Sequence, residues 1–310
     1  MTNNLKKFTI NLPIFFLLVT FFFVICQADA TIRVIIDTSV LFFTKLFPCM
    51  FIFYTLSDLL LNYGILNIFI KLFKNILKKV FHIDSTSSYI IFMSLLTGFP
   101  SGSKFTADFY QKKYINKDIA NYLLTFTHFS NPLFILGTIK ILYNTKIAVI
   151  LLISHYLSNF ILAFLIRPKT YLKTSTKKEI KRTSFSTCLN NSFQSTLTVV
   201  KIVFSTTVFF VAIISLFTTF IHNSYLKALI FGIFDLTKGV TDVNNLTLSL
   251  YRKGILICTF LSLGSVSIHM QVKSLLVNTD LSYSNFLKGR LAATALSLII
   301  YLSLWHFLGN

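Results

Sequence analysis

The stretch TGFPSGSK (residues 97–104) decides the fold, because it interrupts an apolar run with residues that a lipid-facing helix does not use. The run before it, SYIIFMSLLT (residues 88–97), is ten residues long, whereas a spanning helix needs about 20. A polar segment, FTADFYQKKY (residues 105–114), follows the break. A half-length apolar helix, a break with two glycines and a proline, and a polar return predict a re-entrant hairpin.

The composition indicates that this hairpin belongs to an all-α polytopic membrane protein. The chain has 310 residues, of which 54% are hydrophobic and only 13% are charged, and its mean hydropathy is +0.72. Soluble domains carry about 25% charged residues. The apolar blocks are continuous rather than alternating, so they predict helices and not the strands of a barrel.

The net charge of +19 comes from lysines in short loops between the apolar blocks. Lysines in such loops set membrane topology and contact anionic lipid headgroups. We therefore expect membrane lipids, and no nucleic acid, as partners of this charge. A homo-oligomer is possible.

The motifs that mark common enzymes are absent from the sequence: there is no Walker loop, no H-E-x-x-H and no G-x-S-x-G. The cysteines are too far apart for a metal motif: Cys26, Cys49, Cys188 and Cys258. We therefore expect a protein that is not an enzyme and that has no cofactor and no metal site.

Residues 1–83 are predicted to form N-terminal transmembrane helices and an interfacial amphipathic helix. The apolar residues 12–26 lie between two lysines and an A-x-A site, so they form a cleaved signal peptide or, as we favour, an uncleaved first helix. The apolar stretch 31–63 is expected to kink at Pro48. Residues 65–82 place four lysines among Ile, Leu and Phe at helical spacing, which predicts a helix lying in the headgroups.

The remainder is predicted to hold two gate-type repeats, residues 84–167 and 187–310, on either side of a basic cytoplasmic loop, residues 168–186. Each half has a short apolar run with a polar break, then a long helix with a polar centre, then a clean helix. The first half supplies the hairpin tip GFPSGSK, the segment 119–142 broken at FTHFSNPLF (126–134), and the span 147–166. The second half begins with a polar segment, 189–200, and a span, 203–221. It continues with the short run 225–234, which ends in DLTKGVTDVNN (235–245). The segment 254–276, broken at LGSVSIHMQ (263–271), and the span 286–307 complete it.

Such paired interruptions are typical of an inverted-repeat transporter with two re-entrant hairpins and two broken helices. Charge placement puts the N-terminus and the basic loop 167–182 on the cytoplasmic side and the C-terminus on the opposite side. The first hairpin then enters from inside and the second from outside. Arg252 and Lys253 fall on the outer side and count against this arrangement.

Four blocks resemble the YlbJ-type sporulation integral membrane proteins. GFPSGSK is similar to that family's Gly-Tyr-Pro-x-Gly-Ala-Lys block, with Phe99 for tyrosine and Ser103 for alanine. FTHFSNPLFILG is similar to its Phe-Thr-Asn-x-Ser-x-Pro-Leu-Phe block, with His128 for asparagine. FDLTKGV resembles its Leu-Glu-Ile-Thr-x-Gly block, with Asp235 for glutamate, and SVSIHMQVKSLLVNTDL resembles its Ser-Val-His-x-Gln-Val block and the Thr-Asp-Leu beyond it. The similarity extends over residues 32–302.

The resemblance implies a nucleoside recognition gate domain with an architecture similar to concentrative nucleoside transporters. It implies a multi-pass protein of the outer forespore membrane that moves dipicolinate during sporulation. A nucleoside or nucleobase permease, or a sporulation membrane scaffold that transports nothing, remains an alternative.

The two breaks supply the candidate binding residues for a small anionic substrate. Free N–H groups at half-helix starts hold anions, and Lys104 adds a full charge, unless it merely pairs with Asp108 one turn later. His128 and His269 occupy matching places and could carry protons, although a satisfied core histidine is the more common situation. The candidate residues are Gly98, Pro100, Ser101, Gly102, Ser103, Lys104, Ser130, Asn131, Asp235, Thr237, Ser267, His269 and Gln271.

Overall fold

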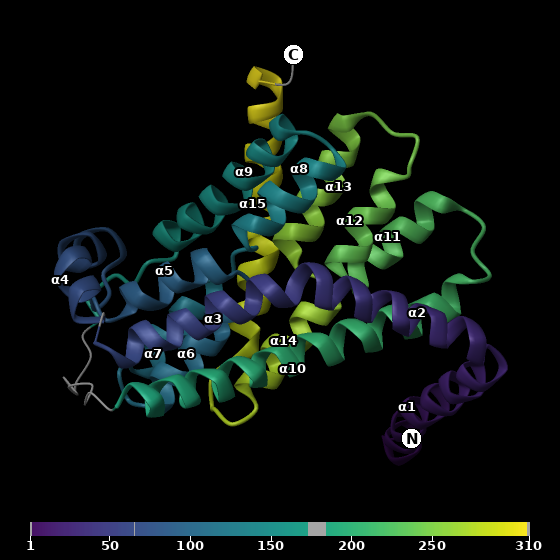
Figure 1. The fold of residues 1–310 in the computed structure, drawn as a ribbon, viewed down its shortest axis with the longest axis horizontal. Helices are drawn as coiled ribbons and strands as arrows, with labels where there is room; N and C mark the ends of the chain where they lie inside the picture. Colours follow the sequence, from purple (N-terminus) through teal and green to yellow (C-terminus); the bar gives the residue numbers. More distant parts are fainter. Residues whose placement is uncertain (1, 65, 173–183, 309–310) are drawn as a thin grey trace.

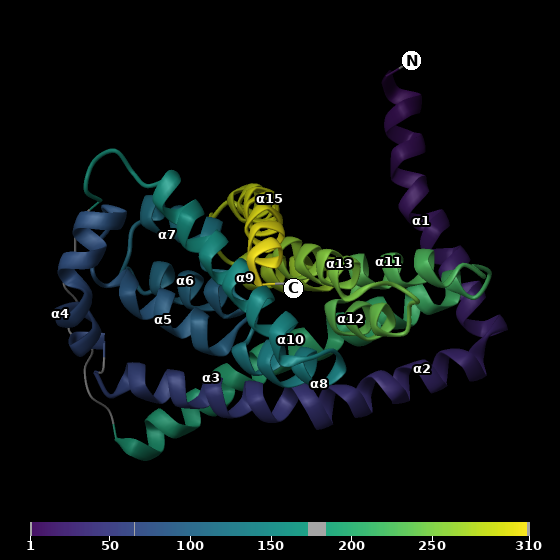
Figure 2. The same ribbon diagram turned by 90° about the horizontal axis from the view of Figure 1, so that it is seen from above.

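The computed structural model describes residues 2–64, 66–172 and 184–308, which are almost entirely helical (Figures 1 and 2). Four helices or helix pairs in this part of the chain are long and apolar enough to cross a membrane: Thr145–Leu165, Phe185–Thr218, Leu250–Leu276 and Tyr283–Leu308. A fifth span is formed if Ile14–Cys26 and Ala28–Leu46 count as one bent segment. The predicted all-α membrane class is confirmed.

The N-terminal helix α1 (Thr2–Cys26) projects away from the remaining helices (Figure 2). It meets the next segment at an angle of 94°. Its described face is apolar and exposed, with Phe15 and Phe22 each about two-thirds exposed. Such a surface is suited to lipid and not to water.

Two long helical rods lie side by side and run in opposite directions (Figures 1 and 2). The first joins α2 (Ala28–Leu41), the π-helical turn η1 (Phe42–Leu46) and α3 (Phe47–Asn62). The kink predicted at Pro48 takes the form of this π-turn, in which the Phe47 N–H donates to Phe42 O. A proline clashes with the carbonyl four residues before it, and the wider turn accommodates that clash.

The second rod is α10 (Phe185–Thr218), a single helix of 34 residues. The sequence predicted two segments here, 189–200 and 203–221, and that division is wrong. No glycine or proline interrupts these residues, and Lys201 between them is exposed, so a charge is accommodated without a break. The rods meet through Phe42 and Phe204, whose ring centroids are 5.1 Å apart, and through a hydrogen bond of 3.1 Å between Thr55 and Thr196.

Two helical hairpins lie toward opposite ends of the long axis (Figures 1 and 2). The first is α5 (Ser87–Thr97) with α6 (Ser101–Gln111), so the break predicted at residues 97–104 is confirmed. The second is α11 (Ser224–Phe234) with α12 (Leu236–Asn244), which are separated by Asp235 alone.

Two broken helices and two uninterrupted ones fill the space between the hairpins. The first break separates α7 (Lys117–Phe126) from η3 (Phe134–Ile139) and α8 (Lys140–Leu142), and residues 127–131 between them are unwound. The second separates α13 (Leu250–Leu263) from α14 (Val266–Leu276) by two residues only. The uninterrupted helices are α9 (Thr145–Leu165) and α15 (Tyr283–Leu308), which pack against each other. The same order of elements occurs in both halves, while their inverted symmetry stays a prediction.

The amphipathic segment is found as α4 (Leu66–Ile76) followed by η2 (Leu77–Phe81). Its end packs against the beginning of the basic loop: Arg167 donates to Val80 O at 3.1 Å, and His82 Nδ1 lies 2.7 Å from Pro168 O. The amphipathic segment and the beginning of the basic loop, the latter expected on the cytoplasmic side, therefore lie on one face of the protein. The greater part of the basic loop, residues 173–183, is outside the described residues.

Candidate functional site

The tip of the first hairpin lies directly against the unwound segment of the first broken helix. A Cβ at Gly98 would lie 2.4 Å from Asn131 N, and one at Gly102 would lie 1.7 Å from Thr127 O. Gly98 also has a φ of +75°, a conformation that only glycine adopts readily. Gly98 therefore serves both the turn and close backbone contact, whereas Gly102, inside α6, serves close contact.

Asn131 holds this junction together with both ends of its side chain. Its Nδ2 donates to Thr97 O at 3.1 Å, and its Oδ1 accepts from Leu133 N at 2.7 Å. The first contact joins the unwound segment to the hairpin, and the second caps the helical turn that follows.

Asp235 performs the matching local task in the second hairpin. Its carboxylate accepts from Lys238 N at 3.0 Å and so caps α12. Ser267, at the beginning of α14, donates to the other oxygen at 3.4 Å, and Ser265 lies 2.8 Å from Ser267. The second hairpin is thereby tied to the second broken helix.

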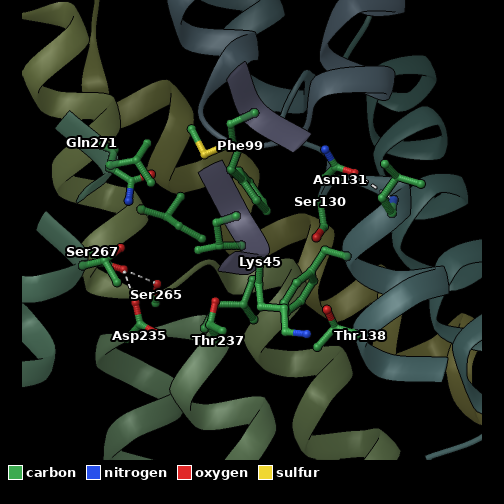
Figure 3. A pocket seen from close by; sticks show the side chains of 18 of the residues that line it. Lys45, Phe99, Ser130, Asn131, Thr138, Asp235, Thr237, Ser265, Ser267 and Gln271 are labelled. Atoms are coloured by element: carbon green, nitrogen blue, oxygen red, sulfur yellow. Dashed lines mark hydrogen bonds between the residues drawn. The ribbon is translucent and has the colours of Figure 1, made fainter. Parts of the chain in front are cut away.

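A cavity of about 120 Å³ lies between these two junctions (Figure 3). This is room for several waters or one small organic solute. Figure 3 shows Asp235, Ser265 and Ser267 on one side, Ser130 and Asn131 on the other, and the Lys45 side chain between them. The full lining is Lys45, Leu46, Met50, Thr97, Phe99, Ser130, Asn131, Leu133, Phe134, Thr138, Val203, Thr207, Asp235, Leu236, Thr237, Ser265, Ser267, Ile268 and Gln271.

Lys45 is the positively charged residue of this lining, and the sequence analysis missed it. It lies on the π-turn η1, three residues before Pro48. Among the described residues, no carboxylate forms an ion pair with it. The only sequence signal for Lys45 was its position at an expected kink, because a wide turn before a proline redirects neighbouring side chains.

Helix starts add to the positive character of the cavity. Residues of the first turns of α12 and α14 line it, Leu236, Thr237, Ser267 and Ile268. Ser265 at the N-cap of α14 makes no side-chain cap hydrogen bond, so the first N–H groups of that helix remain without this cap. The dipoles of both helices favour an anion at this position.

Lys104 does not face the cavity, contrary to its predicted role as the main substrate charge. Its Nζ lies 3.2 Å from Asp58 Oδ1 and 2.9 Å from Asp108 Oδ2, and its side chain is 5% exposed. Two carboxylates therefore neutralise one ammonium inside the protein. The alternative that the sequence left open, pairing with Asp108, is correct but incomplete, because Asp58 comes from α3, 46 residues earlier.

The start of α6 is likewise turned away from the cavity. Gly98, Pro100, Ser101, Gly102 and Ser103 are not part of the lining. Ser101 is fully buried and donates to Gly98 O. The anion contact predicted at Ser101 and Ser103 is therefore not found: Ser101 bonds within the hairpin, and Ser103 is buried away from the cavity, without a hydrogen-bond partner for its hydroxyl among the described residues. Thr97 and Phe99, before them in the chain, reach the cavity.

The two histidines are both engaged in the interior and are absent from the lining. His128 lies in the unwound segment with its Nε2 2.9 Å from Leu124 O. His269 lies inside α14, with Nδ1 2.6 Å from the Tyr283 hydroxyl and Nε2 3.0 Å from Leu263 O. Both rings contact Phe286 edge-on, at centroid distances of 4.4 and 4.9 Å. Their local positions differ, which corrects the expected match.

Six of the thirteen predicted residues do line one cavity: Ser130, Asn131, Asp235, Thr237, Ser267 and Gln271. Gln271 donates to Thr206 Oγ1 of α10 at 3.1 Å, so its amide is also anchored to the second rod. A further polar cluster behind the cavity escaped the sequence analysis. In it, His155 Nε2 accepts from Ser130 N at 2.9 Å, and its Nδ1 lies 3.2 Å from Ser262 Oγ.

A comparison with known proteins finds a similar membrane protein. The chain is 25% identical, over 346 aligned positions, to the sporulation integral membrane protein YlbJ of Bacillus subtilis (strain 168). The alignment covers 97% of this chain and 84% of that protein. This alignment confirms the resemblance that the four sequence blocks indicated. The relative is named as a membrane protein and not as an enzyme.

No protein-family model and no solved structure matches the chain. The expected likeness to concentrative nucleoside transporters, like the inverted repeat, therefore rests on the sequence pattern and stays a prediction.

Proposed function

With its similarity to a sporulation integral membrane protein as the premise, we propose that this multi-pass protein is a secondary transporter or facilitator of a small anionic solute. By the resemblance of its sequence blocks, the proposed solute is dipicolinate and the proposed membrane is the outer forespore membrane. The cavity between the two hairpins and the two broken helices is the proposed binding site.

The observation that carries the proposal is the Lys45 ammonium in a cavity with polar ends and apolar walls. A carboxylate of the solute would contact Lys45, and charge-assisted hydrogen bonds of this kind are shorter and stronger than neutral ones. Phe99, Phe134 and Ile268 offer apolar surface to a flat ring. Asp235 lines the same cavity, but its oxygens accept from Lys238 N and Ser267, and among the described residues it forms no ion pair with Lys45.

The arrangement of breaks supports transport over a static role. Interrupted helices and hairpin tips place backbone polar groups at a site between the two halves, which is the usual design of secondary transporters. A scaffold protein would have no need of such a polar cavity inside an apolar body.

A nucleoside permease is the second candidate, and one observation favours it. Asp235 lines the cavity while Lys104 does not, and a neutral nucleoside would use a carboxylate to bind hydroxyl or amino groups. An anion transporter would depend on Lys45 for substrate binding, whereas a nucleoside permease would depend on Asp235.

Uptake by vesicles that contain the purified protein tests the choice. Labelled dipicolinate and, in a separate series, a labelled nucleoside are offered to the wild type and to two variants, Lys45→Met and Asp235→Asn. In the dipicolinate series, unlabelled nucleosides serve as competitors. The anion proposal expects uptake that Lys45→Met lowers and that nucleosides do not inhibit. Asp235→Asn retains an acceptor for Lys238 N and is expected to keep at least half of the uptake.

The opposite pattern would establish the alternative. Nucleoside uptake that Asp235→Asn abolishes and Lys45→Met leaves intact contradicts the anion proposal. Absence of uptake for both labelled solutes, with folded protein in the vesicles, favours the scaffold.

A further inference from the structure

A second cation, the guanidinium of Arg290, lies behind the cavity and contacts neutral oxygens. Arg290 of α15 is fully buried. Its guanidinium donates to His128 O at 3.1 Å, to Ser262 O at 3.2 Å and to Thr125 O at 3.4 Å, and also to Asn159 Oδ1. Within the described residues no carboxylate forms an ion pair with it.

Two of the four oxygens that accept from Arg290 are carbonyls at the ends of helices. The last four carbonyls of a helix have no partner within that helix. Thr125 O belongs to the last turn of α7, which ends at Phe126, and Ser262 O to the last turn of α13, which ends at Leu263. His128 O belongs to the unwound segment. The negative ends of both helix dipoles therefore converge on one guanidinium.

Close approach of α15 makes this contact possible. A Cβ at Gly289 would lie 2.0 Å from Thr125 O, so only glycine allows the backbone beside Arg290 to come this near to α7. The charge itself costs several kcal/mol to place inside a membrane protein. Among the described residues, neutral oxygens and helix dipoles offset this cost, so the position is one that attracts a cation.

In secondary transporters, unwound carbonyls and the C-terminal ends of half helices are the groups that coordinate a coupling ion. In this chain such a position is occupied by the guanidinium of Arg290, a cation that is part of the protein itself. It also reaches both broken helices at once, since its five N–H donors have a fixed, spread geometry.

We propose that Arg290 is a positioning residue that takes the place of a coupling metal ion, holding the two broken helices together so that the folded protein and its substrate site need no Na⁺. The part that concerns substrate rests on the proposed transport function. The part that concerns the fold does not.

The first experiment measures thermal unfolding of the purified protein in detergent, in NaCl, in KCl and in N-methyl-D-glucamine chloride at equal ionic strength. The wild type is expected to unfold at the same temperature in all three salts. Arg290→Ala is expected to lower that temperature by about 5 °C or more, and Arg290→Lys by less, because an ammonium reaches fewer of the four oxygens. Arg252→Ala, a change at an exposed arginine of α13, is the matched control and should have no effect.

Two results would overturn the proposal. A wild type that unfolds several degrees higher in NaCl than in N-methyl-D-glucamine chloride binds Na⁺ at another site, and Arg290 would then be structural only. An Arg290→Ala protein as stable as the wild type would show that the guanidinium does not hold the breaks together. If Arg290→Ala yields no folded protein, the salt comparison on the wild type and Arg290→Lys still decides.

The second experiment separates this inference from the proposed function. Dipicolinate uptake by wild-type vesicles is expected to change less than two-fold when N-methyl-D-glucamine replaces Na⁺ on both sides, and a ten-fold loss would overturn the inference. Absence of uptake in both salts would contradict the transport function, while the unfolding measurements still judge the role of Arg290 in the fold.

Discussion

Replacing Lys45 by methionine removes the positive charge of the cavity while keeping most of the length and apolar character of the side chain. The residue lies on a π-turn, is exposed and forms no ion pair among the described residues, so the substitution leaves no buried partner without its charge. A hydrogen bond to a charged group contributes about 1.5–3 kcal/mol. Since about 1.4 kcal/mol is a factor of ten in affinity, we expect dipicolinate binding to weaken about ten- to a hundred-fold.

The assay is the concentration dependence of labelled dipicolinate uptake into vesicles, at equal abundance of each variant. Lys45→Arg should restore uptake in part, because the charge returns with a different geometry. Lys79→Met, on the exposed face of η2 outside the cavity, is the matched control and should behave like the wild type. If well-folded Lys45→Met takes up dipicolinate with normal affinity, the cavity is not the anion site and the reasoning from its charge fails.

Three further predictions concern stability, packing and topology. Lys104→Met should lower the free energy of unfolding by about 3–5 kcal/mol because a buried carboxylate loses its partner, and adding Asp58→Leu should recover part of the loss in a thermal unfolding assay; equal stability of the single variant would contradict the ion pair. Gly102→Ala should reduce the yield of folded protein because its Cβ would lie 1.7 Å from a backbone oxygen, whereas Gly137→Ala, with no atom within 4 Å, should not; similar yields would exclude the close contact. A cysteine at Tyr171, which is 41% exposed, should react with an impermeant reagent from the cytoplasmic side only, and labelling from the other side would reverse the topology.

The sequence predicted the breaks well because their causes are local. Glycine at positions 98 and 264, and the proline and asparagine of residues 126–134, disfavour continuous helix whatever surrounds them. Both positions indeed separate helices in the structure. The length of helix α10 was harder to predict. The polar residues within 189–200 suggest the end of a span unless it is known that the first rod packs against them.

The site was predicted only in part because charge pairing depends on distant residues. Asp108 is one turn from Lys104 and visible in the sequence, but Asp58 meets it only through the packing of α3 on the first hairpin. Lys45 reaches the cavity for the same kind of reason, from a rod far from either break. Arg290 was not singled out in the sequence, and only the packing of two helix ends around it reveals its surroundings.

The contact of glycines at the first hairpin with the unwound segment has a mechanical consequence. Where two backbones touch at Gly98 and Gly102, no layer of side chains remains between them that could rearrange during a motion. We therefore expect the hairpin tip and residues 127–131, including Ser130 and Asn131, to behave as a single rigid body in any motion. If the proposed transport function holds, the seam that parts for a solute is the one that the cavity occupies, between this body and the wall that carries Asp235 and Ser267.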